Sequence, residues 1–220
     1  MATNSKIGFV GIGAMGTPMS TDLAKAGYKI VAYDTDPKRT QALASTLEIE
    51  VAGSLEEVGA MCSTVITMLP DGKIARKAIC GDNDSFAGAI TTKLAPGSLI
   101  IDMSSSSPMG TRELGALLEK KGFRFIDAPV SNGVKGAIAA TLSIMVGGDK
   151  AIFEQVKPAL EKLGNQIYYA GPNGSGYGIK VLLNLLSNAF KFTSQGGVRL
   201  NVSVAAGMLL YEAVRQRLTR

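Results

Sequence analysis

The sequence contains no histidine and only two cysteines, Cys62 and Cys80. Without histidine the chain lacks the commonest general acid or base and the commonest zinc ligand, so any proton transfer falls to Lys, Asp, Glu, Tyr or Cys. Two thiols outside any C-x-x-C spacing favour small buried residues over a disulfide or a metal site, and they fit a reducing compartment. No apolar run approaches the roughly 18 residues that a membrane span needs.

The first residues of the sequence do not show the pattern of a targeting segment. "MATNSKIGFVG" soon enters an apolar strand pattern and has neither an apolar signal core nor the features of an Arg-rich transit helix. We therefore expect a soluble, cytoplasmic protein. The 46% share of hydrophobic residues and the 26 glycines are typical of a globular α/β protein with a sizeable core.

The formal net charge of +5 is concentrated at one end of the chain. Residues 166–220 carry six basic side chains and one acidic one, whereas the two signs balance over 1–165. A basic segment can contact nucleic acid, but these charges form no dense cluster and are more typical of a solvated surface. Nucleic-acid binding is therefore not the function we expect.

Strand and helix patterns alternate along the chain up to residue 165. This alternation predicts an α/β fold of the Rossmann type, with a doubly wound, mostly parallel sheet. After Ser54 a helix is expected, with Glu57 placed to close a capping box. The expected strands cover 6–11, 28–34, 64–70, 97–104, 123–130 and 141–148, and further helices are expected over 19–27, 37–47 and 151–164. A last strand followed by a loop is expected over 165–176.

The pattern divides the chain into two parts joined by a loop. We expect a dinucleotide-binding Rossmann domain over 1–165, a linker over 166–173 and a short, incomplete helical segment over 174–220. Within this last segment an apolar helix is expected over 179–190. A short strand and another helix are expected over 198–220.

The turn "VGIGAMG" follows the first expected strand and opens a helix, with glycines at Gly11, Gly13 and Gly16. In such a G-x-G-x-x-G turn the first glycine permits a tight turn, the second lets the backbone approach a pyrophosphate, and the third lets helix and strand pack closely. The helix N-terminus then offers N–H groups and a positive dipole end to the phosphates. Three glycines near a turn can be purely conformational, but the flanking strand and helix favour a dinucleotide site.

Asp34 ends the second expected strand. An acidic side chain there can accept hydrogen bonds from the adenosine ribose hydroxyls and would repel a 2′-phosphate, which favours NAD over NADP as cofactor. Lys38 and Arg39 lie close enough to weaken this preference, or they form an exposed first helical turn. NADP therefore stays open as an alternative.

Several stretches, in order along residues 6–184, resemble one enzyme family. "GFVGIGAMGTPMS" is similar to the opening signature of the β-hydroxyacid dehydrogenases, a group that includes 3-hydroxyisobutyrate dehydrogenase and 6-phosphogluconate dehydrogenase. "ITMLP" and "DMSSSSP" resemble segments beside the cofactor, and "DAPVSNGVKGAIAATLSIMVGG" resembles the substrate-binding stretch. The resemblance implies an NAD(P)-dependent oxidoreductase that transfers a hydride between nicotinamide and a short 3-hydroxy acid, such as 3-hydroxyisobutyrate or a compound like tartronate semialdehyde.

The same resemblance implies roles for single residues. Ser131 would hydrogen-bond the substrate, helped by the backbone of Asn132 and Gly133. Lys180, in "GSGYGIK", would be the catalytic general acid or base, and Asn184 would orient the substrate. The implied cofactor-binding residues are Gly11, Gly13, Ala14, Met15, Gly16, Asp34, Leu69, Pro70 and Ser105.

Physical chemistry agrees with these roles but also fits simpler ones. Lys180 and Asn184 are spaced four residues apart, so they project from one helix face. A partly desolvated lysine, or one near other positive charge, has a lowered pKa and can exchange protons near neutral pH. The same pair would also fit the wet stripe of an amphipathic helix, and Ser131 would also fit a turn.

Three residues depart from the family pattern. Asn132 and Ala140 stand where glycine is usual, and Leu183 replaces the usual Asn or His. The side chain of Asn132 could crowd the substrate or disturb a special backbone angle. We therefore expect cofactor binding to survive these departures more easily than turnover.

From residue 181 onward the sequence also resembles the N-box of histidine kinase ATP-binding modules, with Asn184, Asn188 and Lys191 at matching positions. The glycine-rich lid and the Asp-containing adenine pocket of such modules do not follow, so kinase activity is not expected.

Dehydrogenases of the family continue into a helical bundle that supplies one wall of the substrate cleft and most of the dimer contact. We expect this bundle to be incomplete here, and an open cleft loses substrate positioning and excludes water poorly. A dinucleotide-binding module without turnover is therefore the alternative. Homo-oligomer formation is left open.

Overall fold

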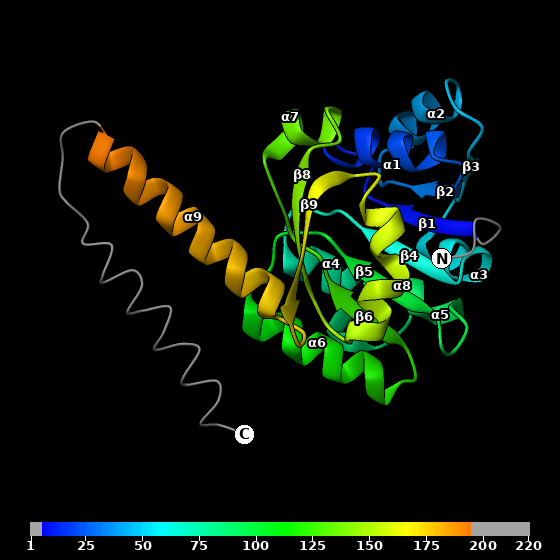
Figure 1. The fold of residues 1–220 in the computed structure, drawn as a ribbon. Helices are drawn as coiled ribbons and strands as arrows, with labels where there is room; N and C mark the ends of the chain where they lie inside the picture. Colours follow the sequence, from blue (N-terminus) through cyan, green and yellow to red (C-terminus); the bar gives the residue numbers. More distant parts are fainter. Residues whose placement is uncertain (1–5, 195–220) are drawn as a thin grey trace. The chain divides into compact units, whose positions relative to one another are not determined.

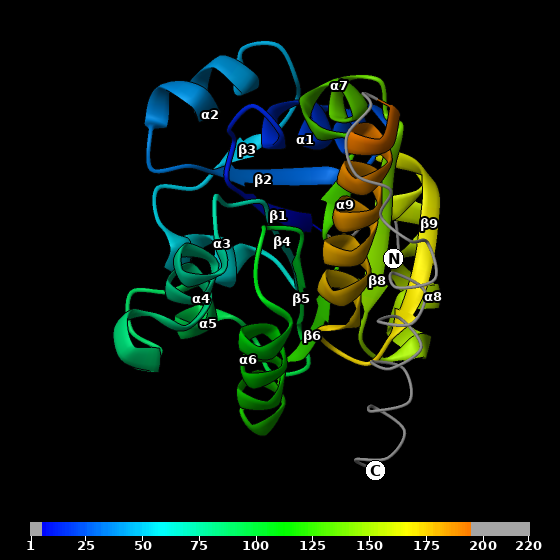
Figure 2. The ribbon, with the colours of Figure 1, turned by 90° about the vertical axis from the view of Figure 1, so that its left-hand side faces the viewer.

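The structure is a computed structural model that describes residues 6–194, with the backbone alone for 186–194. The chain forms two compact units, Met1–Gly178 and Ile179–Arg220. In the first unit helices cover both faces of one mostly parallel sheet (Figures 1 and 2). This arrangement confirms the expected Rossmann-type α/β fold.

The sheet follows the doubly wound strand order β3-β2-β1-β4-β5-β6, in which all neighbouring strands are parallel. Beyond it, β8 runs antiparallel to β6 and β7, and β9 runs parallel to β8. The strands are β1 (Lys6–Val10), β2 (Lys29–Tyr33), β3 (Glu50–Val51), β4 (Thr64–Thr67), β5 (Leu99–Asp102), β6 (Arg124–Asp127), β7 (Val130–Ser131), β8 (Leu142–Gly147) and β9 (Gly164–Gly171).

The helices fill the connections between strands. They are α1 (Gly16–Lys25), α2 (Pro37–Ala44), α3 (Leu55–Met61), α4 (Gly72–Cys80), α5 (Ile90–Lys93), α6 (Pro108–Lys120), α7 (Gly133–Ile138), α8 (Lys150–Leu160) and α9 (Ser175–Ser194), with a 3₁₀ turn at Asp82–Asp84. The expected cap of α3 is present, because Ser54 Oγ accepts a hydrogen bond from the backbone N–H of Glu57 at 3.1 Å. Glu57 reaches back to the N–H of Gly53 at 2.6 Å.

Two hydrophobic clusters lie on the two faces of the sheet. Because side chains alternate along a strand, Ile7 and Phe9 of β1 belong to one cluster and Val10 belongs to the other. Helices α1 and α8 cover the first face, and α3, α4, α5 and α6 cover the second (Figure 2). Burial on both faces explains why the central strands are nearly continuous apolar runs.

The connections after β1 and β4 lead to opposite sides of the sheet, because β1 lies between β2 and β4. In doubly wound sheets, ligands bind in the crevice at the carboxyl ends of the strands, where the strand order reverses. This crevice is where the candidate site lies.

The structure confirms the last strand expected within 165–176, but it contradicts the linker expected over 166–173. Strand β9 occupies Gly164–Gly171, and the first unit continues to Gly178. Most residues of β9 are exposed or half-buried, because the strand lies at the edge of the sheet, so its sequence lacks the apolar run of a central strand. The strand and helix expected over 198–220 lie outside the described residues.

Cys62 and Cys80 are both buried and free of disulfides, as expected. Burial raises the pKa of each thiol to about 12. Within residues 6–194, helices of the length and apolar character needed to cross a membrane are absent.

Candidate active site

The turn between β1 and α1 contains the three glycines of the expected phosphate-binding motif. Gly11 has a φ of +102°, which strains other residues, and a Cβ there would meet the carbonyl oxygen of Met68. A Cβ on Gly16 would meet the carbonyl oxygen of Gly11. The fold itself therefore requires glycine at these two positions.

Gly13 differs from its two neighbours because the fold leaves open space beside it. The nearest atom that a Cβ built on Gly13 would meet is Nη1 of Arg39, at 3.8 Å. The N-terminus of α1 also carries no side-chain cap, and the N–H of Thr17 in its first turn donates to the carbonyl of Gly13 at 2.9 Å. A bare backbone beside an uncapped helix end fits the close approach of a pyrophosphate.

The carboxylate of Asp34 is fixed beside this turn. Its Oδ2 accepts a hydrogen bond from the backbone N–H of Ile12 at 2.8 Å, and its Oδ1 accepts one from Asp36 at 2.9 Å. Nη1 of Arg39 lies 3.6 Å from Oδ2. The acidic group thus lies beside the glycine turn with a cation next to it, and its contact with a ribose stays a prediction.

A pocket of about 410 Å³ opens in front of the turn. It brings together eight of the nine expected cofactor-binding residues, namely Gly11, Gly13, Ala14, Met15, Gly16, Asp34, Leu69 and Pro70. The pocket is also lined by Leu55, Ile74 and Ala78, which were not expected from the sequence. The i, i+4 spacing of Ile74 and Ala78 on α4 was the available signal, because it places both on one helix face.

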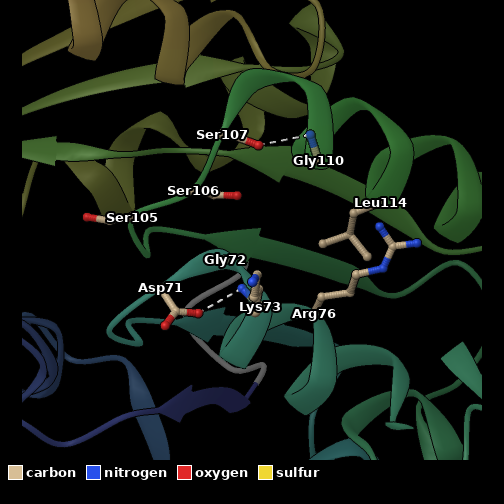
Figure 3. A pocket seen from close by; sticks show the side chains of 9 residues that line it. All are labelled: Asp71, Gly72, Lys73, Arg76, Ser105, Ser106, Ser107, Gly110 and Leu114. Atoms are coloured by element: carbon tan, nitrogen blue, oxygen red, sulfur yellow. Dashed lines mark hydrogen bonds between the residues drawn. The ribbon is translucent and has the colours of Figure 1, made fainter. Parts of the chain in front are cut away.

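Ser105, the ninth expected residue, lines a separate pocket of about 680 Å³ between the first turns of α4 and α6 (Figure 3). Asp71 and Ser107 cap these helices by accepting hydrogen bonds from the N–H groups of Lys73 at 2.8 Å and Gly110 at 3.1 Å. Ser105 thus lines a different pocket from the other eight, although its neighbour Ser104 is hydrogen-bonded to Leu69. The remaining lining residues are Gly72, Arg76, Ser106 and Leu114.

The expected substrate-binding residues lie where β7 meets α7. Ser131 ends β7 and is half-buried, and Gly133 begins α7. Asn132 between them adopts the left-handed conformation, with a φ of +79°. Asparagine tolerates this conformation better than most residues. Its amide nitrogen donates to the carbonyl of Thr141 at 2.9 Å and to Oγ of Ser143 at 3.3 Å, so the side chain is anchored towards β8.

Lys180 and Asn184 lie one turn apart on α9, in the second compact unit. The helical spacing that the sequence predicted is therefore present. That the two residues meet Ser131 in one site stays a prediction.

Two buried aspartates at strand ends were not singled out in the sequence. Asp102 ends β5, Asp127 ends β6, and the two are partners in the parallel register. Oδ1 of Asp127 accepts a hydrogen bond from the N–H of Gly174 at 2.7 Å, while Oδ2 has no partner among the described residues. Burial raises the pKa of Asp127 to about 7. An acidic residue closing an apolar strand, as in "LIID" and "RFID", was the signal that could have revealed this pair.

Comparison with known families gives one match that covers most of the chain. The family described as the NAD binding domain of 6-phosphogluconate dehydrogenase matches residues 6–171. The chain belongs to the β-hydroxyacid dehydrogenase family. Its cofactor is NAD(P), which the open space at Gly13 and the uncapped end of α1 accommodate.

Named relatives within this family are dehydrogenases and reductases. The chain is 37% identical over 186 residues to 2-(hydroxymethyl)glutarate dehydrogenase of Eubacterium barkeri, covering 84% of this chain and 60% of the relative. It is 38% identical to mitochondrial 3-hydroxyisobutyrate dehydrogenase of Mus musculus, covering 84% of this chain and 54% of the relative. The chain thus spans a little over half the length of these relatives.

A solved structure of the family shares the fold. It is 3-hydroxyisobutyrate dehydrogenase of Mycobacterium tuberculosis with L-serine, which is 35% identical, has a TM-score of 0.74, and is matched over 86% of this chain and 64% of its own. The family match ends at residue 171, so it does not extend to the stretch that resembles a kinase N-box. That likeness stays a prediction, and the side chains of Asn188 and Lys191 lie outside the described residues.

The departures from the β-hydroxyacid dehydrogenase pattern have structural counterparts. Ala140, which replaces a usual glycine, has a φ of +51°. Both it and Asn132 therefore hold a backbone conformation that suits glycine best. Leu183, the third departure, is exposed on α9.

Proposed function

We propose that this protein is an NAD(P)-dependent dehydrogenase or reductase acting on a short 3-hydroxy acid. The observation that carries the proposal is the open phosphate-binding turn. The fold leaves room for a side chain at Gly13, so packing does not explain why this residue is glycine. Relatives named for 2-(hydroxymethyl)glutarate and 3-hydroxyisobutyrate support the substrate class.

The residues have separate roles in this proposal. When bound, NAD(P) supplies the acceptor or donor of a hydride at the hydroxyl-bearing carbon. Lys180 takes the hydroxyl proton as the alcohol becomes a carbonyl, and it returns the proton in the reverse direction. Ser131 and the backbone of Asn132 and Gly133 hold the substrate, and Asn184 orients it.

We also propose that NAD is preferred over NADP. The carboxylate of Asp34 is fixed beside the glycine turn by the N–H of Ile12, and at the ribose of a bound cofactor it would repel a 2′-phosphate. Arg39, 3.6 Å from that carboxylate, offsets part of the repulsion. Side-by-side titrations with NADH and NADPH test the preference, since tighter binding of NADPH would contradict it.

The setting that fits this activity is a reducing one. Two buried free thiols, Cys62 and Cys80, agree with the cytoplasm as the location we propose. Association of several copies of the chain is part of the same proposal, and the mass of the protein in solution tests it.

The experiment for the proposal follows NADH formation with a panel of short 3-hydroxy acids, beside a direct titration with NADH. We expect binding of NADH and turnover of at least one acid. Binding of NADH without turnover of any acid would favour a dinucleotide-binding module instead. Failure to bind either NADH or NADPH would contradict the cofactor assignment itself.

A further inference from the structure

Ser104 connects two loops at the carboxyl end of the sheet. It is fully buried two residues after the end of β5. Its hydroxyl accepts a hydrogen bond from the backbone N–H of Leu69 at 2.9 Å, and its own N–H donates to Oδ1 of Asp102 at 3.0 Å. The loop that follows β4 is therefore tied to the loop that follows β5.

Asp102 is the charged centre of this arrangement. Besides the N–H of Ser104, its carboxylate accepts hydrogen bonds from Oγ1 of Thr67 at 2.9 Å and from the hydroxyl of Tyr177 at 3.0 Å. Only 1% of Asp102 is exposed, and a buried carboxylate is costly unless it is hydrogen-bonded in this way. Each of the three donors is thus held in place by the charge.

Tyr177 brings the first turn of α9 into the same network. Its side chain is fully enclosed, and its hydroxyl lies 2.6 Å from the carbonyl oxygen of Ser104 as well as 3.0 Å from Asp102. Burial, and then the nearby charge of Asp102, raise the pKa of Tyr177, so the phenol keeps its proton and acts as a donor. The phenolic proton is therefore shared between a carboxylate at the end of β5 and a carbonyl oxygen in the loop that follows β5.

The loops that this network fixes follow β4 and β5, and they extend from the glycine-turn pocket to the half of the sheet where a nicotinamide would be bound. In a doubly wound fold the two halves of a dinucleotide lie on either side of the point where strand order reverses. The glycine turn and Asp34 belong to β1 and β2, which places the adenosine half there. Ser105 follows β5 on the other half, and Leu69 follows β4 and lines the glycine-turn pocket, so its loop adjoins both halves.

We propose that Asp102, Ser104 and Tyr177 are positioning residues that hold the loops of Leu69 and Ser105 in the arrangement required for the nicotinamide half of the cofactor. The inference rests on the proposed function. It adds a role for residues of the sheet and of the start of α9 that need not contact the cofactor themselves. A displacement of Ser104 would move both loops, because Ser104 is hydrogen-bonded to Leu69 and directly precedes Ser105 in the chain.

The test compares NADH with ADP-ribose, which has the adenosine and both phosphates but no nicotinamide. Tyr177→Phe removes the shared donor and leaves part of a buried carboxylate unpaired. Hydrogen bonds to charged groups are strong enough that we expect NADH to bind roughly tenfold more weakly, with a clearly smaller loss for ADP-ribose. A purely structural role would not change the ratio of the two affinities.

Two further variants make the test decisive. Tyr169→Phe is the matched control, because it removes a tyrosine hydrogen bond to the carbonyl of Gly148, at 3.0 Å, away from the two loops. Ser104→Ala removes the acceptor for the N–H of Leu69, and we expect it to weaken NADH binding as Tyr177→Phe does. It replaces Tyr177→Phe in the test if that variant folds poorly.

The outcomes separate this inference from the proposed function. Selective weakening of NADH binding in the Tyr177 or Ser104 variant, and none in the Tyr169 variant, supports the positioning role. Equal changes for NADH and ADP-ribose, or no change while the wild type binds NADH, overturn it. A wild-type protein that binds neither ligand contradicts the proposed function and with it this inference.

Discussion

At the scale of single residues, the glycines of the phosphate-binding turn have different physical reasons for being glycine. Gly11 and Gly16 are surrounded by backbone atoms that leave no room for a Cβ, whereas Gly13 has room for one. The sequence alone predicted the motif, but it could not tell which glycine serves the fold and which serves a ligand. That distinction depends on distances between segments far apart in sequence, such as Gly11 and Met68.

The open position leads to a prediction about binding without loss of folding. In Gly13→Val the side chain should occupy the space where the pyrophosphate approaches, so we expect NADH to bind roughly 100-fold more weakly or worse, about 2.7 kcal/mol. Thermal unfolding of this variant should stay close to that of the wild type. Gly16→Val is the contrast, since it should lower the melting temperature sharply. Undiminished NADH affinity in Gly13→Val would contradict the site.

Ala140 is a residue whose backbone conformation predicts a gain of stability. Its φ of +51° is in the left-handed region, which costs residues other than glycine roughly 1–2 kcal/mol. Glycine relieves this cost, and the flexibility that it adds to the unfolded chain offsets part of the gain, so Ala140→Gly should raise the free energy of unfolding by about 1 kcal/mol. Denaturant unfolding measures this change.

The neighbouring alanine supplies the control for that variant. Ala139 has a φ of −88°, where alanine carries no such strain. Ala139→Gly should therefore lower stability slightly. If Ala140→Gly lowers the free energy of unfolding as much as Ala139→Gly does, the backbone of Ala140 is not strained.

At the scale of elements, the end of β6 and the start of α9 are joined through a buried acid. Oδ1 of Asp127 accepts the N–H of Gly174 at 2.7 Å, just before the first residue of the helix. The pKa of Asp127 is raised to about 7, first by burial and in small part by the charge of Asp102, although the hydrogen bond from Gly174 lowers it. The native state therefore holds a proton that the unfolded chain releases near its ordinary pKa of 3.8.

This shift has a defined consequence for stability against pH. Because the folded pKa is the higher one, the contribution of the bound proton is complete below about pH 4 and is lost as the pH rises to about 7. Its size is about 1.4 kcal/mol for each pH unit between the two pKa values. Asp127→Asn keeps an acceptor for Gly174 but cannot ionise, so its stability should not show this decline. Chemical unfolding from pH 4 to 8 compares the two, and parallel curves would contradict the assignment.

How well an element could be predicted from sequence depended on where it lies in the sheet. The central strands β1, β4 and β5 are buried on both faces, so their apolar runs revealed them. Strands β3 and β7 have two residues each, so their sequences carry little signal. The strand β9 was expected, but because it lies at an edge and lacks a long apolar run, most of its residues were also assigned to a linker over 166–173.

At the scale of the whole molecule, the chain forms two compact units with the predicted cofactor site in the first. Eight of nine cofactor-binding predictions fall in one pocket, because a local motif and two strand ends define it. The buried bonds of Asp102 and Tyr177 could not be predicted, since they join residues 75 positions apart in sequence. Nothing in the spacing of either residue reveals the other.

The proposed general acid or base, Lys180, belongs to the second unit. The proposed activity depends on Lys180, because the cofactor pocket lies in the first unit whereas the residue to which we assign proton transfer lies in the second. Lys180→Ala should therefore separate binding from turnover.

The most direct measurement follows NADH formation from short 3-hydroxy acids by the wild type and by Lys180→Ala, with an NADH titration of both. We expect the substitution to lower kcat by roughly 10²–10⁴-fold, as loss of a general acid or base does, and to leave the Kd for NADH unchanged. Equal turnover by the two proteins, or no turnover by a wild type that binds NADH, would contradict the account.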